Sequence, residues 1–337
     1  MGKNTLSYQD FANTVQQELN TDLTWQAQYA GYANDLLDNE TRLKEARKHF
    51  HQKKPLPVYL SIGSAQSKTP QFNLRFLGQS IGDLQVKGDD VFLKITKNQA
   101  ENNKQYFSNK EDATEEIFVK AGNYPWNGKH AAEIRDAFAN RLSDPAYLPR
   151  QHEHMVESAL YSEFEKASGE TKALCGIQPI MYADCRFHMK TALKASLAKN
   201  DIVEESESGG DIDLFCRRKI GNQSYLTVIE IKDENKATET PEKAIKQAIA
   251  YAVFIRELLR CDCGEKWKKI WGVENQHWEN SVTLNAVIAM PQKDADDLSF
   301  VGQEIRLGND IIRLHYISFV GERKLRDGEA FEIKTSL

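Results

Sequence analysis

The sequence lacks several features that would assign it to a specialised class of protein. It has no run of 18 or more apolar residues, so no membrane-spanning helix and no membrane partner are expected. It has no internal repeat and no low-complexity tract, which gives no support to a repeat architecture. A net charge of −5 and a pI of about 6.0 argue against a nucleic-acid binder driven by a basic tail. A local basic surface would still be able to contact phosphate groups.

Cysteine is scarce and irregularly placed. The chain has five cysteines, an odd number, which favours free thiols in a reducing cytoplasm over a disulfide framework. Cys261 and Cys263 form one C-x-C pair, and no second pair completes a zinc site, so we interpret them as ordinary thiols. The first residues, MGKNTLSYQD, lack the apolar segment of a signal peptide. A cytoplasmic location is therefore predicted.

The length of 337 residues favours two domains, since domains usually have about 100–200 residues. Helical patterns over 8–20 and 26–50 precede strand-like runs between 58 and 122. This order predicts an N-terminal α+β module over residues 1–145, a candidate for target recognition or for sensing a signal. Two prolines within 142–151 mark the expected boundary.

The second half, residues 146–337, has a different order of elements. We expect two helices and several strands, in the order helix 152–167, strands near 185–196, 209–218 and 224–232, helix 241–260, and strands near 281–291 and 305–319. This order predicts an α/β domain with a mixed central sheet flanked by helices.

Two charged residues lie at the end of an otherwise apolar strand-like run, YLTVIEIK at 225–232. Side chains alternate between the faces of a strand, so Glu230 and Lys232 share a face and lie about 7 Å apart. Burying a charge is unfavourable unless it is paired or bound to something. Glu-x-Lys occurs five times in the chain, but only Glu230 ends a long strand-like run before a long helix. We therefore expect this pair to belong to a site.

The preceding strand-like run, GGDIDLF, also carries acidic residues. Asp211 and Asp213 share one face of the strand that this run predicts. The connection RRKIGNQ is short and contains Gly221, which is typical of a hairpin turn. An antiparallel hairpin would bring Asp213 beside Glu230 and Lys232.

Two carboxylates and a lysine at one sheet edge suit a divalent cation. Mg²⁺ prefers carboxylate and water oxygens, so we predict that Asp213 and Glu230 hold Mg²⁺ or Mn²⁺. The ion would polarise a phosphate oxygen and lower the pKa of a bound water molecule. Lys232 would orient the attacking water or stabilise the charge that develops on the phosphoryl oxygens.

The helix that follows the charged strand carries two further polar residues. Thr240 is its expected N-cap and Pro241 its first helical residue. Gln247 and Tyr251 are four residues apart and share a face. A glutamine on an inward face needs a hydrogen-bond partner, and for a lone glutamine a satisfied position in the core is the simpler interpretation.

Together, the segments GGDIDLF, VIEIK and KQAIAYA resemble the PD-(D/E)XK nuclease superfamily, the fold of many restriction enzymes and Holliday-junction resolvases. In that superfamily an acidic residue ends one strand, E-x-K lies on the next, and several branches carry Q-x-x-x-Y on the following helix. The resemblance implies a restriction-endonuclease-like sheet with Asp213 and Glu230 as metal ligands and Lys232 as the catalytic lysine. Gln247 and Tyr251 would support the site or contact the substrate backbone.

Two ligand assignments stay open within this resemblance, which covers residues 155–290 approximately. The proline of the family name is absent, so Asp211 rivals Asp213 as the first ligand. We prefer Asp213, because G-x-x-I-D-L variants of the superfamily place the acid there. Many members also have a glutamate on the helix before the first core strand. Glu157 and Glu163 are the candidates, and we favour Glu157 because E-x-x-L-Y resembles some nuclease branches.

The resemblance implies a metal-dependent nuclease that hydrolyses DNA phosphodiester bonds. An endonuclease of restriction or phage defence is the expected setting, by analogy of fold. RNA as substrate and exonuclease action stay open, and cutting both strands would favour a homodimer. The alternatives are a non-cleaving nuclease-fold protein that binds nucleic acid or regulates a partner, and a charged surface hairpin without a catalytic role.

Overall fold

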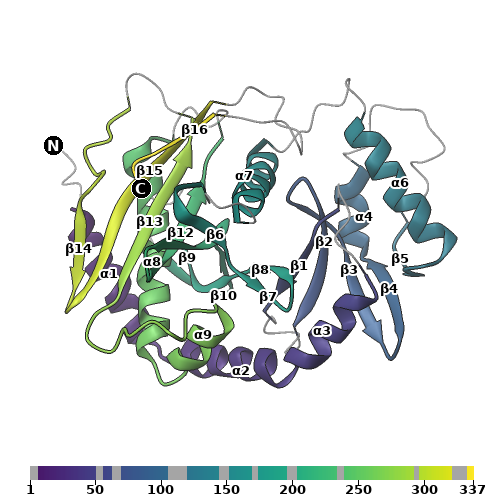
Figure 1. Ribbon diagram of the computed structural model, residues 1–337, viewed down its shortest axis with the longest axis horizontal. Helices are drawn as coiled ribbons and strands as arrows, with labels where there is room; N and C mark the ends of the chain where they lie inside the picture. The colour runs from purple at the N-terminus through teal and green to yellow at the C-terminus, as the bar shows by residue number, and fades with distance from the viewer. Residues whose placement is uncertain are drawn as a thin grey trace.

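The computed structural model describes residues 7–50, 56–62, 70–104, 120–143, 152–168, 174–195, 203–233, 239–291, 296–320 and 332–337. Within these residues the chain forms two seven-stranded sheets, a two-stranded ribbon and helices that flank them (Figure 1). The predicted α/β class, with mixed sheets and flanking helices, is confirmed. None of the helices in the described part of the chain has the length and hydropathy of a membrane-spanning segment.

The first sheet contains all the described strands of the N-terminal part and two strands from the second half. Its order is β5-β4-β3-β2-β1-β8-β7, and only the β1–β8 pair is parallel. The strands are β1 (Val58–Ser61), β2 (Gln71–Phe76), β3 (Gln79–Lys87), β4 (Asp90–Ile95), β5 (Gly122–Pro125), β7 (Met181–Tyr182) and β8 (Cys185–His188). Helices near this sheet are α3 (Glu40–Lys48), α4 (Lys97–Lys104), which packs on β3, and α6 (Lys129–Ser143), which packs on β5.

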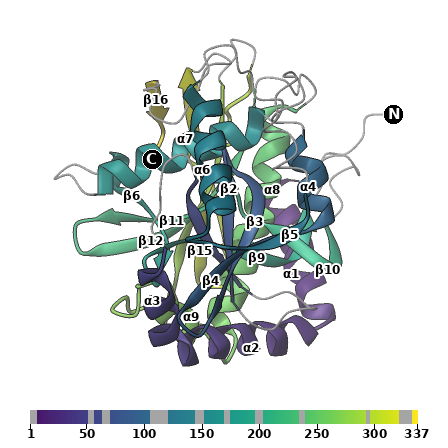
Figure 2. The ribbon, with the colours of Figure 1, turned by 90° about the vertical axis from the view of Figure 1, so that its right-hand side faces the viewer.

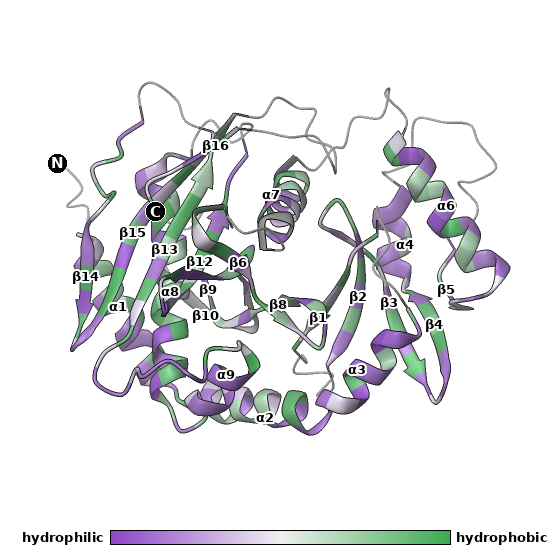
Figure 3. Ribbon diagram, viewed as in Figure 1, coloured by the Kyte–Doolittle hydropathy of each residue, from purple (hydrophilic) through white to green (hydrophobic). Residues whose placement is uncertain are grey.

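The second sheet has the order β14-β15-β13-β12-β11-β6, with β16 paired to β15. Its central pairs β12–β13 and β13–β15 are parallel and the others are antiparallel. The strands are β6 (Ile177–Pro179), β11 (Leu214–Ile220), β12 (Gln223–Ile231), β13 (Thr283–Met290), β14 (Glu304–Leu307), β15 (Asp310–Val320) and β16 (Glu332–Thr335). Strand β13 is buried and mostly apolar, as expected for a parallel strand covered on both faces (Figure 3).

Two helices flank the second sheet close to the predicted site. Helix α8 (Pro241–Arg260) packs against β12, β13 and β15, and α7 (His152–Ser168) contacts β6 and β12. Helix α8 begins with proline at its first position, as predicted, because the first turn needs no backbone donor there. Thr240 holds the N-cap position, but its side chain makes no capping hydrogen bond.

Contacts join the two predicted domains extensively. Helix α1 (Tyr8–Thr21) packs on α8, and α2 (Thr24–Asp38) packs on α9 (Gly264–Ile270). Figures 1 and 2 show α2 and α9 at the foot of the molecule. The ring centroids of Trp25 and Tyr29 lie 5.4 and 5.0 Å from that of Phe254. The predicted boundary at 145/146 falls in 144–151, outside the described residues, and the division into two domains stays a prediction.

The run predicted as a single strand over 209–218 is divided between two sheets. Strand β10 (Val203–Asp211) pairs with β9 (Lys190–Ala195) in the ribbon, whereas β11 begins at Leu214 in the second sheet. At the crossing, the backbone N–H of Ile212 donates to the carbonyl of Met189 at 3.0 Å. The expectation that Asp211 and Asp213 share a face of one strand is therefore wrong, because the chain changes sheet between them.

Candidate functional site

The predicted hairpin forms the centre of the candidate site. Strands β11 and β12 are antiparallel, and Leu214 pairs with Ile229. Asp213 directly precedes that pair, just beyond the end of the ladder, and its side chain lies beside that of Glu230. The backbone N–H of Ile231 donates to Asp213 Oδ2 at 2.8 Å, which fixes the carboxylate at the end of the hairpin. The acid and the strand-end glutamate therefore come together as the alternation of the sequence predicts.

Lys232 is a buried cation surrounded by carboxylates. It is 3% exposed, and its Nζ lies 3.0 Å from Glu230 Oε1 and 3.4 Å from Glu153 Oε1. Burial alone would lower the pKa of a lysine, but the charges of Glu230, Asp213 and Glu153 outweigh it and raise the pKa of Lys232. The side chain therefore remains an ammonium ion at neutral pH.

Asp213 and Glu230 place two carboxyl groups in a poorly solvated position. Burial, followed by the charge of Glu230, raises the pKa of Asp213 well above its usual value. Burial also raises the pKa of Glu230, while Lys232 opposes that shift. Two close carboxyl groups repel each other when both are ionised, and a neighbouring cation relieves that repulsion. Binding of a cation would therefore lower the electrostatic free energy of this carboxylate pair.

A third carboxyl group, that of Glu157 on α7, is part of the same cluster. Glu157 is 5% exposed, with its Oε1 3.6 Å from Arg75 Nη1, and its charge raises the pKa of Asp213. Within the described residues, the buried atoms Glu157 Oε1 and Glu230 Oε2 have no hydrogen-bond partner. Buried acceptors without a donor are unfavourable, and a divalent cation is the kind of group that would satisfy them. The donor set therefore fits the predicted Mg²⁺ or Mn²⁺.

The two rival residues lie outside this cluster of three. Asp211 is on the β9–β10 ribbon, with its side chain 58% exposed and its Oδ1 3.8 Å from His188 Nε2. Glu163 lies six residues beyond Glu157 on α7, roughly 9 Å further along the helix axis. The structure thus brings together the two residues that the sequence favours, Asp213 and Glu157. Their roles as ligands stay predictions.

Helix α8 brings Gln247 and Tyr251 to the same region. A side-chain hydrogen bond joins the two residues. Burial, followed by the charges of Glu230 and Asp213, raises the pKa of Tyr251. Gly210 on β10 permits this approach, because a Cβ at that position would lie 2.7 Å from Tyr251 Oη. Gln247 thus has a hydrogen-bond partner. This contact also agrees with the simpler interpretation, in which Gln247 is a core glutamine without a role in a site.

Several neighbours of the site could not be seen in the sequence motifs. Arg75 comes from β2 in the first sheet, and no local pattern relates it to α7. His188 ends β8, and burial, followed by the charge of Arg75, lowers its pKa to about 4. The sequence could have identified Glu153, because it lies four residues before Glu157 and shares its helix face. The site is therefore built from both sheets, whereas the motifs point only to the second.

No group of three histidine, cysteine, aspartate or glutamate side chains in the described ranges already has the arrangement of an assembled metal centre. The ammonium of Lys232 lies against Glu230 instead. Comparison with protein-family models, with curated proteins and with solved structures finds no match to this chain. The resemblance to a nuclease superfamily therefore rests on the residues described above.

Proposed function

We propose that the protein is a divalent-metal-dependent nuclease of the PD-(D/E)XK superfamily that hydrolyses DNA phosphodiester bonds. One observation carries the proposal. Asp213 and Glu230 face each other beside the buried Lys232, and Glu230 retains an orphaned carboxylate oxygen. A surface hairpin with ordinary solvated charges would not bury a glutamate and a lysine this deeply, at 2% and 3% exposure.

The order of the elements supports the same class of protein. The acid precedes β11, E-x-K ends β12, and Gln247 and Tyr251 lie on the next helix, α8. Glu157 lies on α7, before the first strand of this sheet. This is the order in which the superfamily carries its motifs, and it supports the proposal.

Each residue has a role in the proposed reaction. Asp213 and Glu230 would hold Mg²⁺ or Mn²⁺, with Glu157 as a neighbouring carboxylate. When bound, such an ion supplies a Lewis acid for a phosphate oxygen and a water molecule of lowered pKa. Lys232 keeps its positive charge in a poorly solvated position, where it would orient the attacking water or balance charge on the phosphoryl oxygens. Tyr251 and Gln247 would support the site.

Plasmid cleavage tests the proposal, with supercoiled DNA, Mg²⁺ or Mn²⁺, and EDTA as the metal-free control. We expect wild type to nick or linearise the plasmid, and Lys232→Ala and Asp213→Ala to cut about 10²–10³-fold more slowly. Lys334→Ala is a matched control, because Lys334 belongs to a second Glu-Ile-Lys tripeptide on β16, outside the site. The proposal is wrong if wild type cuts neither DNA nor RNA, or if Lys232→Ala and Lys334→Ala cut equally well.

A non-cleaving nucleic-acid-binding or regulatory protein is the second candidate. The ion pairs of Lys232 with Glu230 and Glu153 favour it, because they already place a positive charge of the protein against two carboxylates, without a metal ion. Such a protein would bind DNA with an affinity that falls with salt concentration, and it would show no metal-dependent cleavage. The plasmid assay therefore separates the two candidates.

The proposed biological setting is restriction or phage defence in the cytoplasm. It rests on analogy of fold, and the five cysteines, all free thiols, are compatible with a reducing compartment. A closed circular plasmid distinguishes endonuclease from exonuclease action, since only an endonuclease can open it. Linear product without nicked intermediate would indicate concerted cutting of both strands and favour a homodimer.

A further inference from the structure

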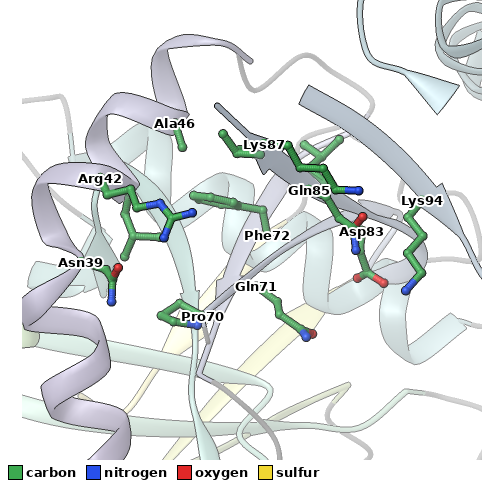
Figure 4. Close-up of a pocket in the computed structure, with 13 residues that line it drawn as sticks. Asn39, Arg42, Ala46, Pro70, Gln71, Phe72, Asp83, Gln85, Lys87 and Lys94 are labelled. Atoms are coloured by element: carbon green, nitrogen blue, oxygen red, sulfur yellow. The ribbon is translucent and has the colours of Figure 1, made fainter. Parts of the chain in front are cut away.

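A polar pocket opens in the N-terminal part of the molecule, outside the candidate nuclease site. It has a volume of about 460 Å³ and lies between α3 and the strands β2, β3 and β4 (Figure 4). Helix α3 contributes Arg42, and the strands contribute Phe72, Asp83, Lys87 and Lys94. None of these residues takes part in the proposed cleavage chemistry.

The pocket carries an excess of positive charge in a chain whose net charge is −5. Arg42, Lys87 and Lys94 are exposed, and Asp83 is the only acidic residue in the lining. Across the part of the chain that the structure describes, the side chains of Arg42 and Lys94 have neither an ion pair nor a hydrogen bond. Exposed cations without partners remain available to an anionic ligand.

The size and lining of the pocket suit more than a single phosphate ion. Sites for small molecules typically have volumes of about 300–1,000 Å³, and this pocket lies within that range. Phe72 and Leu84 give it an apolar wall, while the amides of Gln71 and Gln85 can both donate and accept hydrogen bonds. Cationic groups for phosphate, an apolar wall for a ring and amides for ring edges together fit a nucleotide.

A chain of polar contacts leads from the pocket to the candidate nuclease site. Asp83 Oδ1 accepts a hydrogen bond from Asn73 Nδ2 at 2.9 Å, and Asn73 Oδ1 accepts one from Arg75 Nε at 3.0 Å. Arg75 lies over the Tyr59 ring, 4.4 Å from its centroid, and its Nη1 is 3.6 Å from Glu157 Oε1. Two side chains therefore separate a residue of the pocket from a carboxylate on α7.

We propose that this pocket binds a nucleotide through its phosphate groups, and that binding is transmitted to α7 through Asp83, Asn73 and Arg75. The shared chemistry is a nucleotide 5′-phosphate, which either a free nucleotide or the end of a DNA strand can supply. A contiguous network makes such coupling physically possible, and a measured response at α7 is needed to establish it. The proposal holds whether or not the protein cleaves DNA.

Calorimetric titration of the full chain in EDTA tests binding with two probes, ATP and 5′-phosphorylated tetrathymidylate. Binding of ATP supports a free nucleotide, and binding of the oligonucleotide alone supports a strand end. Arg42→Glu and Lys94→Glu should each weaken binding at least about 10-fold, because each reverses a charge that contacts phosphate. Lys97→Glu is the matched control, since Lys97 is exposed on the neighbouring helix α4 and does not line the pocket.

The pocket assignment is overturned if neither probe binds, or if the pocket variants bind as well as Lys97→Glu. Circular dichroism of each variant would confirm that it is folded. Tetrathymidylate lacking the 5′-phosphate completes the design, because equal binding of both oligonucleotides would show that the phosphate is not recognised and would also overturn the assignment.

Hydrogen–deuterium exchange tests the transmission to α7 without any cleavage assay. Saturation with the probe that binds should slow exchange in β2, β3 and α7. In Asn73→Ser, which removes the amide between Asp83 and Arg75, the protection of β2 and β3 should remain and the change at α7 should be lost. Unchanged exchange at α7 in wild type would overturn the proposed transmission. Because no cleavage is measured, this outcome is independent of whether the proposed nuclease activity exists.

Discussion

The candidate site and the N-terminal pocket hold charge in opposite ways. In the site, Lys232 is buried against Glu230 and Glu153, so its positive charge is balanced by carboxylates of the protein itself. In the pocket, Arg42 and Lys94 are exposed and balanced by solvent. A buried charge is destabilising unless a partner or a ligand balances it, whereas water stabilises an exposed charge that has no partner. The two regions should therefore respond very differently to the loss of a single cation.

Replacing Lys232 with alanine should have the largest effect on stability. The change leaves buried carboxylates without their cation, and breaking a buried pair in this way typically destabilises by about 3–5 kcal/mol. The corresponding change in the pocket, Lys94→Ala, should alter the free energy of unfolding by less than about 0.5 kcal/mol. Urea unfolding at neutral pH measures both. Similar changes in the free energy of unfolding for the two variants would show that the two regions do not differ in how they hold charge.

Addition of Mn²⁺ should stabilise the candidate site and leave the pocket unaffected. At a hundredfold excess over Kd, a ligand of the native state stabilises it by about 2.7 kcal/mol. Thermal unfolding of wild type and Lys94→Ala should shift upward equally, while Asp213→Asn and Glu230→Gln should show little shift. The affinity should also rise with pH, because burial raises the pKa of Asp213 and the ion competes with its proton. If Mn²⁺ raised the unfolding temperature of Asp213→Asn as much as that of wild type, the ion would bind elsewhere.

A pair of glycine substitutions probes how tightly the ribbon packs against α8. A Cβ at Gly210 would lie 2.7 Å from both Leu193 O and Tyr251 Oη, so Gly210→Ala should destabilise by about 1–3 kcal/mol. Gly31 lies in α2, where an added Cβ would meet no atom within 4 Å, so Gly31→Ala should be neutral or stabilise by up to about 1 kcal/mol. Thermal unfolding compares them. A Gly210→Ala protein as stable as wild type would show that Tyr251 is loosely held.

His188 lies near the candidate site, where the charges of Arg75, Asp211, Glu157 and Lys190 act on it. Its pKa of about 4 in the folded protein is below the unfolded value of about 6.5, so its contribution to stability is complete above pH 6.5. That contribution should be lost progressively as the pH falls toward 4. Unfolding of wild type and His188→Gln between pH 4 and 7 should therefore show a steeper decline for wild type. Parallel curves would show that His188 is not held in its neutral form.

The charged hairpin could be predicted from sequence because its pattern is local. Strand alternation places Glu230 and Lys232 on one face, and the short turn at Gly221 sets the register that brings Asp213 opposite Glu230. Helix α8 is equally predictable, since proline at its start and its apolar periodicity are encoded within one segment. These features depend on neighbours in the chain, which is why they emerge without tertiary information.

The change of sheet between Asp211 and Asp213 could not be predicted, because it depends on long-range pairing. Alternation continues through GGDIDLF as if it were one strand, but β10 pairs with β9 and β11 pairs with β6 and β12. The position of Arg75 beside the site could not be predicted for the same reason. Its contact with Glu157 joins residues far apart in sequence, and neither position carries a pattern that refers to the other.

The parallel pairing of β8 with β1 has a consequence for dissection of the molecule. Strand β8 belongs to the second half of the chain but is hydrogen-bonded into the first sheet, while α1 and α2 cover α8 and α9. Truncation at the predicted boundary, 145/146, would expose the edge of β8 and the apolar surface around Phe254, and an exposed strand edge favours edge-to-edge aggregation. Each half supplies a piece of the other's scaffold, so the roles of the two halves are best separated by point substitutions in the intact chain.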